Sequence, residues 1–400
     1  MDRIAAAFEI ARADVRAGTV RADGDGRART RHLAIGDPQA PFERFLAILD
    51  GHGALGDDGR LRPDVHLVTM GDHFDWGTRD ERARATDDAL ALLAWLAAHP
   101  ADQATLIAGN HDLARVGEMA AFDDDSFGRA RAEADLAYVD GKTDEAAEKR
   151  LLEKYPDVPT TECLARDFAA FSPAQRTLVV NCIAAKRLRV AFPVARDFLL
   201  CHAGVTLDEL DVLGVPESAR ADAFAIAASL NGALDEAFAE WDGKTPFAIR
   251  GLHRPGNARD GEARGMFFHR PSNPDHEEAA LFAGPPRRRF DPRRLPPGLS
   301  QAIGHIRDNK CRRLLEGWND GAAATDGPLR ILETDGVRVR YRAGTATAMR
   351  NASRVYFTDG GMSHAEPSRY ELLDLATRAA ATRVEGAFVR RRDDIGSAGP

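Results

Sequence analysis

Five short motifs on this chain combine carboxylate, amide and imidazole side chains, which are the donor types that divalent metal ions bind in proteins. In chain order they are Gly36-Asp37-Pro38-Gln39, Gly71-Asp72-His73-Phe74-Asp75, Gly109-Asn110-His111-Asp112, His202-Ala203-Gly204 and Gly304-His305. Two divalent ions about 3.5–4 Å apart can clamp a phosphoryl group and lower the pKa of a bound water. The motifs therefore predict a two-metal centre that cleaves phosphate esters.

The ligands of the two ions can be assigned from residue type and spacing. Asp72 follows a strongly apolar run directly and is the best candidate for the bridging carboxylate. Asp37 and Gln39 stand two apart on an extended turn, so they can point to one side and bind one ion. The other ion is expected to be bound by Asn110, His202 and His305. Oxygen and imidazole donors without a thiolate suit manganese, iron, zinc or cobalt better than calcium, and ligand type does not choose among the four. Manganese is the first expectation, with iron, zinc or cobalt as alternatives.

His111 and Asp75 are the candidates for acid catalysis. His111 follows Asn110 directly and is expected to lie beside the ions without binding them. A protonated imidazole there could give the leaving oxygen its proton, and Asp75 could orient and charge the ring.

Most of the motifs follow a short apolar run, which predicts buried strands that end at the ligands. The runs are 33–35, 65–70, 105–108, 198–201 and 302–303. Apolar residues at helical spacing predict helices over 42–50 and 83–98, and a hairpin is expected over 329–333 and 337–341, followed by a strand over 355–357. This order is typical of an α/β fold, whose right-handed crossovers place the loops at one edge.

The expected domain organisation has three parts. Residues 1–30 should form an N-terminal helix and a glycine-rich flexible connection. Residues 31–365 should form the main domain, with a helical insertion at about 115–195 that is rich in Ala, Arg, Glu and Leu. Residues 366–400 should form a last helix, beginning at Pro367, and a loose charged end over 390–400.

The composition excludes several classes of protein. The net charge of −8 argues against a generic nucleic-acid or anionic-membrane binder. The four cysteines form no CxxC pair, charged residues interrupt the N-terminal segment, and no apolar run is long enough to cross a bilayer. We therefore expect a soluble cytoplasmic protein without membrane partners, and the oligomeric state stays open.

The motifs in this order resemble those of the calcineurin-like metallophosphoesterases, closest to the phosphoprotein-phosphatase branch with its bacterial diadenosine-tetraphosphatase relatives. That family's motifs are Gly-Asp-x-His, Gly-Asp-x-x-Asp-Arg-Gly, Gly-Asn-His-Glu or Gly-Asn-His-Asp, and His-Gly-Gly. The resemblance covers roughly Arg31 to Gly361. It implies two mixed β-sheets flanked by helices with the site at one edge. It also implies the ligand set assigned above, in which Asp72 bridges the two ions. Asp75 and His111 correspond to the family's acid pair.

Three departures from the family pattern bear on the substrate. Gln39 replaces a His, Trp76 replaces the Arg that grips phosphate, and the last motif lacks the second His of the wider superfamily. Arg270 lies in Phe267-Phe268-His269-Arg270-Pro271, which is similar to an aromatic-x-Arg-Pro segment that binds phosphate in some relatives. The phosphate clamp is therefore either missing or supplied by Arg270, Arg254, Arg79 or Arg82.

The expected activity is hydrolysis of phosphomonoesters or phosphoprotein-like substrates by direct attack of a hydroxide bound to the metal pair. The substrate could be a phosphorylated small molecule, a nucleotide or a phosphoprotein. The missing Arg at Trp76 and the large insertion leave phosphodiesterase or nucleotide polyphosphate hydrolase activity open. Gln39 leaves open a scaffold that binds phosphate without turnover.

Overall fold

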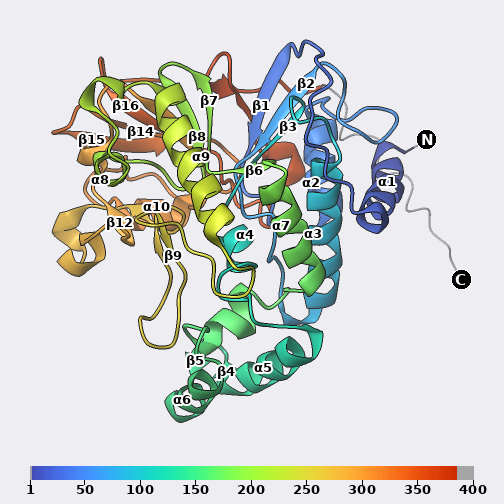
Figure 1. The fold of residues 1–400 in the computed structure, drawn as a ribbon. Coiled ribbons are helices and arrows are strands. Elements are labelled where there is room, and N and C mark those ends of the chain that lie inside the picture. The colour runs from blue at the N-terminus through green and yellow to red at the C-terminus, as the bar shows by residue number, and fades with distance from the viewer. Residues whose placement is uncertain (1, 385–400) are drawn as a thin grey trace, which may run out of the picture.

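The computed structural model describes residues 2–384, in which two six-stranded sheets pack against each other (Figure 1). The strand order of the first sheet is β18-β17-β1-β2-β3-β6. Its central strands β1 to β3 and β6 are parallel, and β17 and β18 are antiparallel at one side. The bounds are β1 (Arg31–Ile35), β2 (Val65–Thr69), β3 (Ala104–Ile107), β6 (Leu188–Arg189), β17 (Leu373–Asp374) and β18 (Ala379–Ala380).

The second sheet has the order β15-β14-β16-β13-β8-β7, with β16, β13 and β8 parallel. The bounds are β7 (Ala191–Ala195), β8 (Phe198–Cys201), β13 (Ser300–Ile303), β14 (Arg330–Thr334), β15 (Val339–Ala343) and β16 (Ser353–Phe357). The predicted α/β fold of two mixed sheets flanked by helices is confirmed, as are the hairpin β14–β15 and the strands before the motifs.

Alternating side chains separate the core into two layers, as expected for strands buried on both faces. Ala34, Val68 and Ile107 of the first sheet pack between the sheets against side chains such as Leu200 and Tyr356. The intervening leucines, Leu33, Leu67 and Leu106, belong to the cluster shared with the outer helices.

Helices cover the outer faces of both sheets (Figure 1). Beside the first sheet lie α2 (Phe42–Gly51), α3 (Arg82–Ala97) and α7 (Pro173–Ala184), and α1 (Arg3–Ala17) packs on the outer side of α2 and α3. Beside β7 and β8 lies α9 (Ala223–Glu240). The predicted helices over 42–50 and 83–98 and the N-terminal helix are thus confirmed. Smaller elements are α8 (Leu207–Val212), β9 (His253–Arg254), β10 (Arg264–Gly265), β11 (Arg270–Pro271), β12 (Arg289–Phe290) and α10 (Asp308–Leu314). Within residues 2–384 every helix is too short or too polar to cross a lipid bilayer.

The helical insertion forms a small lobe at one end of the molecule, around α5 (Asp124–Ala137) and α6 (Glu145–Lys154) (Figure 1). It has its own hydrophobic cluster and a short hairpin, β4 (Tyr138–Val139) with β5 (Lys142–Thr143). The expected end at 195 was wrong, because β6 and β7 already belong to the two main sheets. The strand β6 was not predicted because the charged residue Arg187 directly precedes it. In the structure the side chain of Arg187 is buried and donates to the carbonyls of Ala97, His99 and Ala104.

The helix expected from Pro367 was also wrong. The described chain has a 3-10 turn over Pro367–Arg369 and then β17 and β18. Leu373 pairs with Ala34 at the edge of the first sheet and is buried between the sheets. This burial outweighs the helix propensity of the Leu- and Ala-rich segment. The loose end expected over 390–400 lies outside the described residues.

Candidate metal and phosphate site

The five motifs meet where the parallel strands of both sheets end. In the first sheet Ile35 of β1 pairs with Thr69 of β2, and Thr69 pairs with Leu106 of β3, so their following loops leave at the same level. In the second sheet Ala302 of β13 pairs with Leu200 of β8. Because carboxyl ends of parallel strands share one edge, the ligands of all five loops converge there.

Two histidines define the first half of the site. Nε2 of His202 lies 3.1 Å from Nδ1 of His305. The opposite nitrogens face carbonyl oxygens: Nδ1 of His202 lies 2.7 Å from the oxygen of Met70, and Nε2 of His305 lies 3.1 Å from that of Phe268. A carbonyl oxygen only accepts, so each ring donates to its carbonyl and, when neutral, carries a lone pair on the other nitrogen. The two lone pairs face one another, which is an arrangement that fits a cation.

Further donors surround the same point. Oδ1 of Asn110 lies 3.1 Å from Nε2 of His202, and Oδ2 of Asp72 lies 3.5 Å from it. The ligand atoms of Asp72, His202 and His305 all lie within 4.8 Å of one another. Burial disfavours a charge on His202, but Asp72 outweighs it and raises the pKa of the ring, so the surroundings stabilise positive charge here. Burial and the charge of Arg270 hold the pKa of His305 well below its ordinary value, which keeps that ring neutral.

Asp37 and Gln39 form the second half of the site. Oδ2 of Asp37 accepts the backbone N–H of His305 at 2.8 Å, whereas Oδ1 has no hydrogen-bond partner among residues 2–384 although Asp37 is only 3% exposed. Burial, together with Asp359 and Asp72, raises the pKa of Asp37 well above its ordinary range. Nε2 of Gln39 donates to the carbonyl of Phe74 at 3.0 Å, which leaves its Oε1 available. Both residues line the same cavity, and a buried carboxylate oxygen without a partner together with an amide oxygen suits a bound cation.

Close approach of the loops positions these carboxylates. A Cβ on Gly109 would lie 2.1 Å from Oδ1 of Asp72, and one on Gly304 would lie 1.8 Å from Oδ1 of Asp37, so neither position can carry a side chain. Asp72 and His305 themselves have positive φ values of 53° and 65°, an uncommon and strained backbone for residues other than glycine. Both strained ligands are therefore held by their neighbours rather than by local preference.

Asp112 is a positioning residue that the sequence analysis did not assign. It lies in α4 (Asn110–Ala114), and its buried carboxylate accepts the backbone N–H groups of Gly109 at 2.8 Å and of Asp72 and His73 at 3.1 Å. It therefore ties the second and third motifs together at the start of α4. The signal was its place five residues after the end of β3, at the third helical position where a carboxylate can cap.

His111 and Asp75 lie together as expected, and Arg115 completes a buried chain of charges. Nδ1 of His111 lies 2.8 Å from Oδ2 of Asp75, and Arg115 binds both oxygens of Asp75 at 2.6 and 2.8 Å. Burial opposes a charge on His111, but Asp72 and Asp75 outweigh it and raise its pKa. Burial also opposes the charge of Asp75, and Arg115 overcomes it, so the pKa of Asp75 is lowered. Arg115, one turn after His111, was not predicted.

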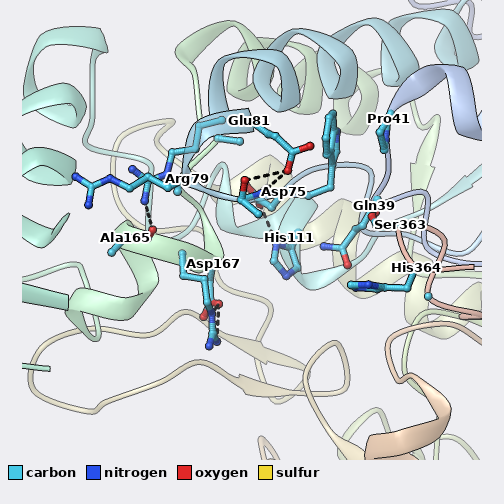
Figure 2. Close-up of a pocket in the computed structure, with 18 of the residues that line it drawn as sticks. Gln39, Pro41, Asp75, Arg79, Glu81, His111, Ala165, Asp167, Ser363 and His364 are labelled. Atoms are coloured by element: carbon cyan, nitrogen blue, oxygen red, sulfur yellow. Dashed lines mark hydrogen bonds and ion pairs between the residues drawn. The ribbon is translucent and has the colours of Figure 1, made fainter. Parts of the chain in front are cut away.

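Two cavities open onto the site. The smaller, of about 570 Å³, is lined by Asp72, Asn110, His111 and His305 together with cationic side chains of Arg270, Arg307, Lys310 and Arg313. The larger, of about 790 Å³, lies between the motif loops and the insertion. In Figure 2, Asp75 and His111 lie together in its centre, Gln39 and His364 on one side, and Arg79, Ala165 and Asp167 on the other.

The cations of the smaller cavity are only partly neutralised. Arg307 pairs with Asp326 at 2.8 Å, whereas Arg270, Lys310 and Arg313 form no ion pair with any residue in 2–384. Burial and the repulsion of Arg289 lower the pKa of Arg270 to about 10. Uncompensated positive charge beside the ligand cluster favours an anionic group such as phosphate.

The other candidate clamps lie elsewhere. Arg254 is on β9 and lines neither described cavity, so the structure does not bring it to the site. Arg79 and Arg82 line the larger cavity but both pair with Asp135, at 3.2 and 2.6 Å. Trp76 is nearly buried in a small cluster and offers an apolar wall there.

The fold and this site together define a metal-dependent phosphoesterase. Residues 30–257 match the calcineurin-like phosphoesterase family, and the chain belongs to that family, a group of hydrolases acting on phosphate esters. The predicted family and enzyme class are thereby confirmed. No curated protein matches the chain significantly.

Several solved structures are similar to this chain at low sequence identity. A cold-active protein-tyrosine phosphatase of a psychrophilic Shewanella species is 13% identical, with a TM-score of 0.33 and coverage of 90% of this chain and 84% of that chain. A protein serine/threonine phosphatase from Saccharomyces cerevisiae, described as similar to human phosphatase PP5, is 14% identical, with a TM-score of 0.32 and coverage of 91% and 94%. Because these scores are low, the family assignment rests on the sequence match.

Proposed function

We propose that the protein hydrolyses phosphomonoesters at a centre of two divalent ions, with Mn²⁺ the first expectation. The nitrogens of His202 and His305 that face one another at 3.1 Å carry this proposal, because their lone pairs can bind a cation that replaces the proton otherwise held between them. Asp37, Gln39 and Asp72 would hold one ion, and Asp72, Asn110, His202 and His305 the other. A phosphorylated small molecule, a nucleotide or a phosphoprotein would be the substrate.

The chemistry divides between the ions and the side chains of the chain. Two bound divalent ions would neutralise phosphoryl charge and lower the pKa of water. His111 donates its Nδ1 hydrogen to Asp75, which leaves Nε2 to face the substrate and to protonate the leaving oxygen. Arg270 would hold the phosphate, while Lys310 and Arg313 attract the anion into the cavity.

One observation favours a second activity. The larger cavity adjoins His111 and is walled by Trp76, where an apolar ester group could lie next to the phosphate. A phosphodiester would place its second ester group there. Comparing a monoaryl with a diaryl phosphate at equal metal loading separates these activities, because a monoesterase should turn over the monoaryl ester faster.

We also propose a cytoplasmic location. All four cysteines are buried and free, which fits a reducing compartment. Retention of activity in a strongly reducing buffer is the expected result, and inactivation by reductant would contradict this location.

The central test combines metal removal with substitution of the ligands. Purified protein, stripped by a chelator and reconstituted with Mn²⁺, should hydrolyse an aryl phosphate, whereas Asp72→Asn and His202→Asn should lose about 10²-fold or more in kcat. His276→Ala removes an exposed histidine that lines neither cavity and is the matched control. Full activity in the stripped enzyme or in both ligand variants would reject the proposal.

A further inference from the structure

We propose that Asp359 is a ligand of the ion held by Asp37 and Gln39, where it supplies the strong donor that Gln39 does not. This inference rests on the proposed two-metal centre. The family match ends at residue 257, so it does not include Asp359.

Strand pairing places Asp359 beside a predicted ligand. Asp359 follows β16, which is parallel to β13 with Phe357 opposite Ile303. Asp359 and His305 each lie two residues beyond this pair, Asp359 after the end of β16 and His305 after the end of β13. The pairing continues past the strand ends, because the N–H of Thr358 donates to the carbonyl of Ile303 at 2.8 Å. The loop of Asp359 therefore leaves the sheet next to the loop of His305.

The same loop touches the loop of Asp37, which comes from the other sheet. A Cβ on Gly36 would lie 2.1 Å from the carbonyl oxygen of Thr358, so the two backbones are in direct contact. The hydroxyl of Tyr370 donates to this oxygen at 3.2 Å and closes the junction. Since Asp37 and Asp359 each follow directly after the touching residues, the two carboxylates emerge side by side.

The carboxylate of Asp359 is buried and short of partners. The residue is 7% exposed, and Oδ1 accepts the N–H of Gly361 at 2.9 Å, within its own loop. Among residues 2–384 no Lys, Arg or His forms an ion pair with it; Arg330 binds only its backbone carbonyl. Burial raises the pKa of Asp359 and the neighbouring Asp72 adds to this effect, although the charges of Arg330 and Arg307 and the hydrogen bond from Gly361 act in the opposite direction. Adjacent buried carboxylates that form no direct ion pair are stabilised when they bind a metal ion.

Asp359 also faces the volume in which the substrate would bind. It lines both cavities, as Gln39 does. With Asp37, Asp72 and the amide of Gln39, it would complete a set made only of oxygen donors. Oxygen donors suit Mn²⁺ or Mg²⁺, whereas imidazoles suit zinc and iron as well. The two sites should therefore differ, with the Asp37 site selective for the harder ion.

The test measures metal binding directly. Chelator-stripped wild type, Asp359→Asn and Asp359→Ala are titrated with Mn²⁺, and bound metal per chain is counted by mass spectrometry. Wild type should bind two ions. Both variants should keep one ion and bind the second at least about tenfold more weakly, by analogy with the loss on removing outer partners of a metal site. Asp87→Asn, an exposed aspartate on α3, is the control and should match wild type.

Comparing the two variants distinguishes a role of Asp359 as a metal ligand from a role as a hydrogen-bond acceptor within its own loop. The Asn side chain retains an oxygen for the N–H of Gly361, so it preserves the loop, whereas Ala does not. Weak second-site binding in both variants supports the ligand role. Wild-type binding in Asp359→Asn overturns it, even if Asp359→Ala is weak. A wild-type protein that binds fewer than two ions would instead overturn the proposed two-metal function itself.

Discussion

Glu118 allows a stability prediction whose size follows from its surroundings. Its Oε1 accepts the N–H of Gly256 at 2.7 Å, whereas Oε2 has no hydrogen-bond partner in the described part of the chain, and the residue is 1% exposed. Burial raises its pKa from 4.5 to about 7, although His111 and Arg115 act in the opposite direction. Cys163 is the other titratable group close to it. The folded protein therefore holds a proton on Glu118 at pH values where the unfolded chain has lost it.

Replacing Glu118 with glutamine should remove this pH dependence. Between pH 4.5 and about 7 the folded state binds more protons at this position than the unfolded state. The contribution of Glu118 to stability is therefore complete below pH 4.5 and is lost as the pH rises through 7. The interval between the two pKa values corresponds to about 3 kcal/mol. Glutamine keeps the size and the acceptor for Gly256 but cannot ionise.

Urea unfolding of metal-free protein at pH 5 and pH 8 measures the effect. The free energy of unfolding of Glu118→Gln, relative to wild type, should rise by about 2.5 kcal/mol between these pH values, because a small part of the contribution is already lost at pH 5. Glu236→Gln, an exposed glutamate on α9, controls for the loss of a charge and should show no such rise. A difference between Glu118→Gln and wild type that is the same at both pH values would refute the reasoning.

Three further predictions concern the site. Asp75→Asn should lower kcat about 10²-fold in steady-state assays, because His111 loses the carboxylate that favours its protonated form. Combined Lys310→Ala and Arg313→Ala should raise KM about tenfold or more per charge while kcat changes little, because a charge-assisted hydrogen bond contributes about 1.5–3 kcal/mol. Gln39→His should tighten binding of Zn²⁺ more than of Mn²⁺ in a metal titration, because imidazole is the softer donor.

Each of these has a distinct control. Asp75→Asn leaves Arg115 buried without its carboxylate, so thermal unfolding must show a folded protein before the kcat is interpreted; an unchanged kcat in folded protein contradicts the acid role. Lys149→Ala with Arg150→Ala removes the same two charges from an exposed part of α6. Equal KM changes in both double variants would mean that net charge, and not the cavity, attracts the substrate. Unchanged zinc affinity in Gln39→His would count against residue 39 as a ligand.

The sequence by itself determined the strands and the predicted ligands that follow them. An apolar run that ends in Gly-Asp, Gly-Asn or a lone His is a local pattern, and a parallel strand places whatever follows it at one edge. For this reason Asp72, Asn110, His202 and His305 could be assigned together although up to 233 positions separate them. Asp72 and Asn110 follow strands of the first sheet and His202 and His305 follow strands of the second, so the meeting of the two pairs depends on how the sheets pack.

The tertiary structure decided the features that depend on contacts between the sheets. Asp359 follows a strand as Asp72 does, but only the contact of Gly36 with Thr358 brings its carboxylate beside Asp37. Arg254 was predicted as a phosphate clamp from its residue type, but the tertiary structure does not place it in the lining of either cavity.

Strand pairing at the side of β1 explains why the helix predicted from Pro367 does not form. The segment around Leu373 has helix-forming composition, yet an open edge on β1 and an apolar space between the sheets make it a strand. Propensity is worth a few tenths of a kcal/mol per residue, whereas burying one leucine contributes about 1.5–3 kcal/mol. Local residue preferences therefore predict elements and motifs, and long-range burial decides which of them meet.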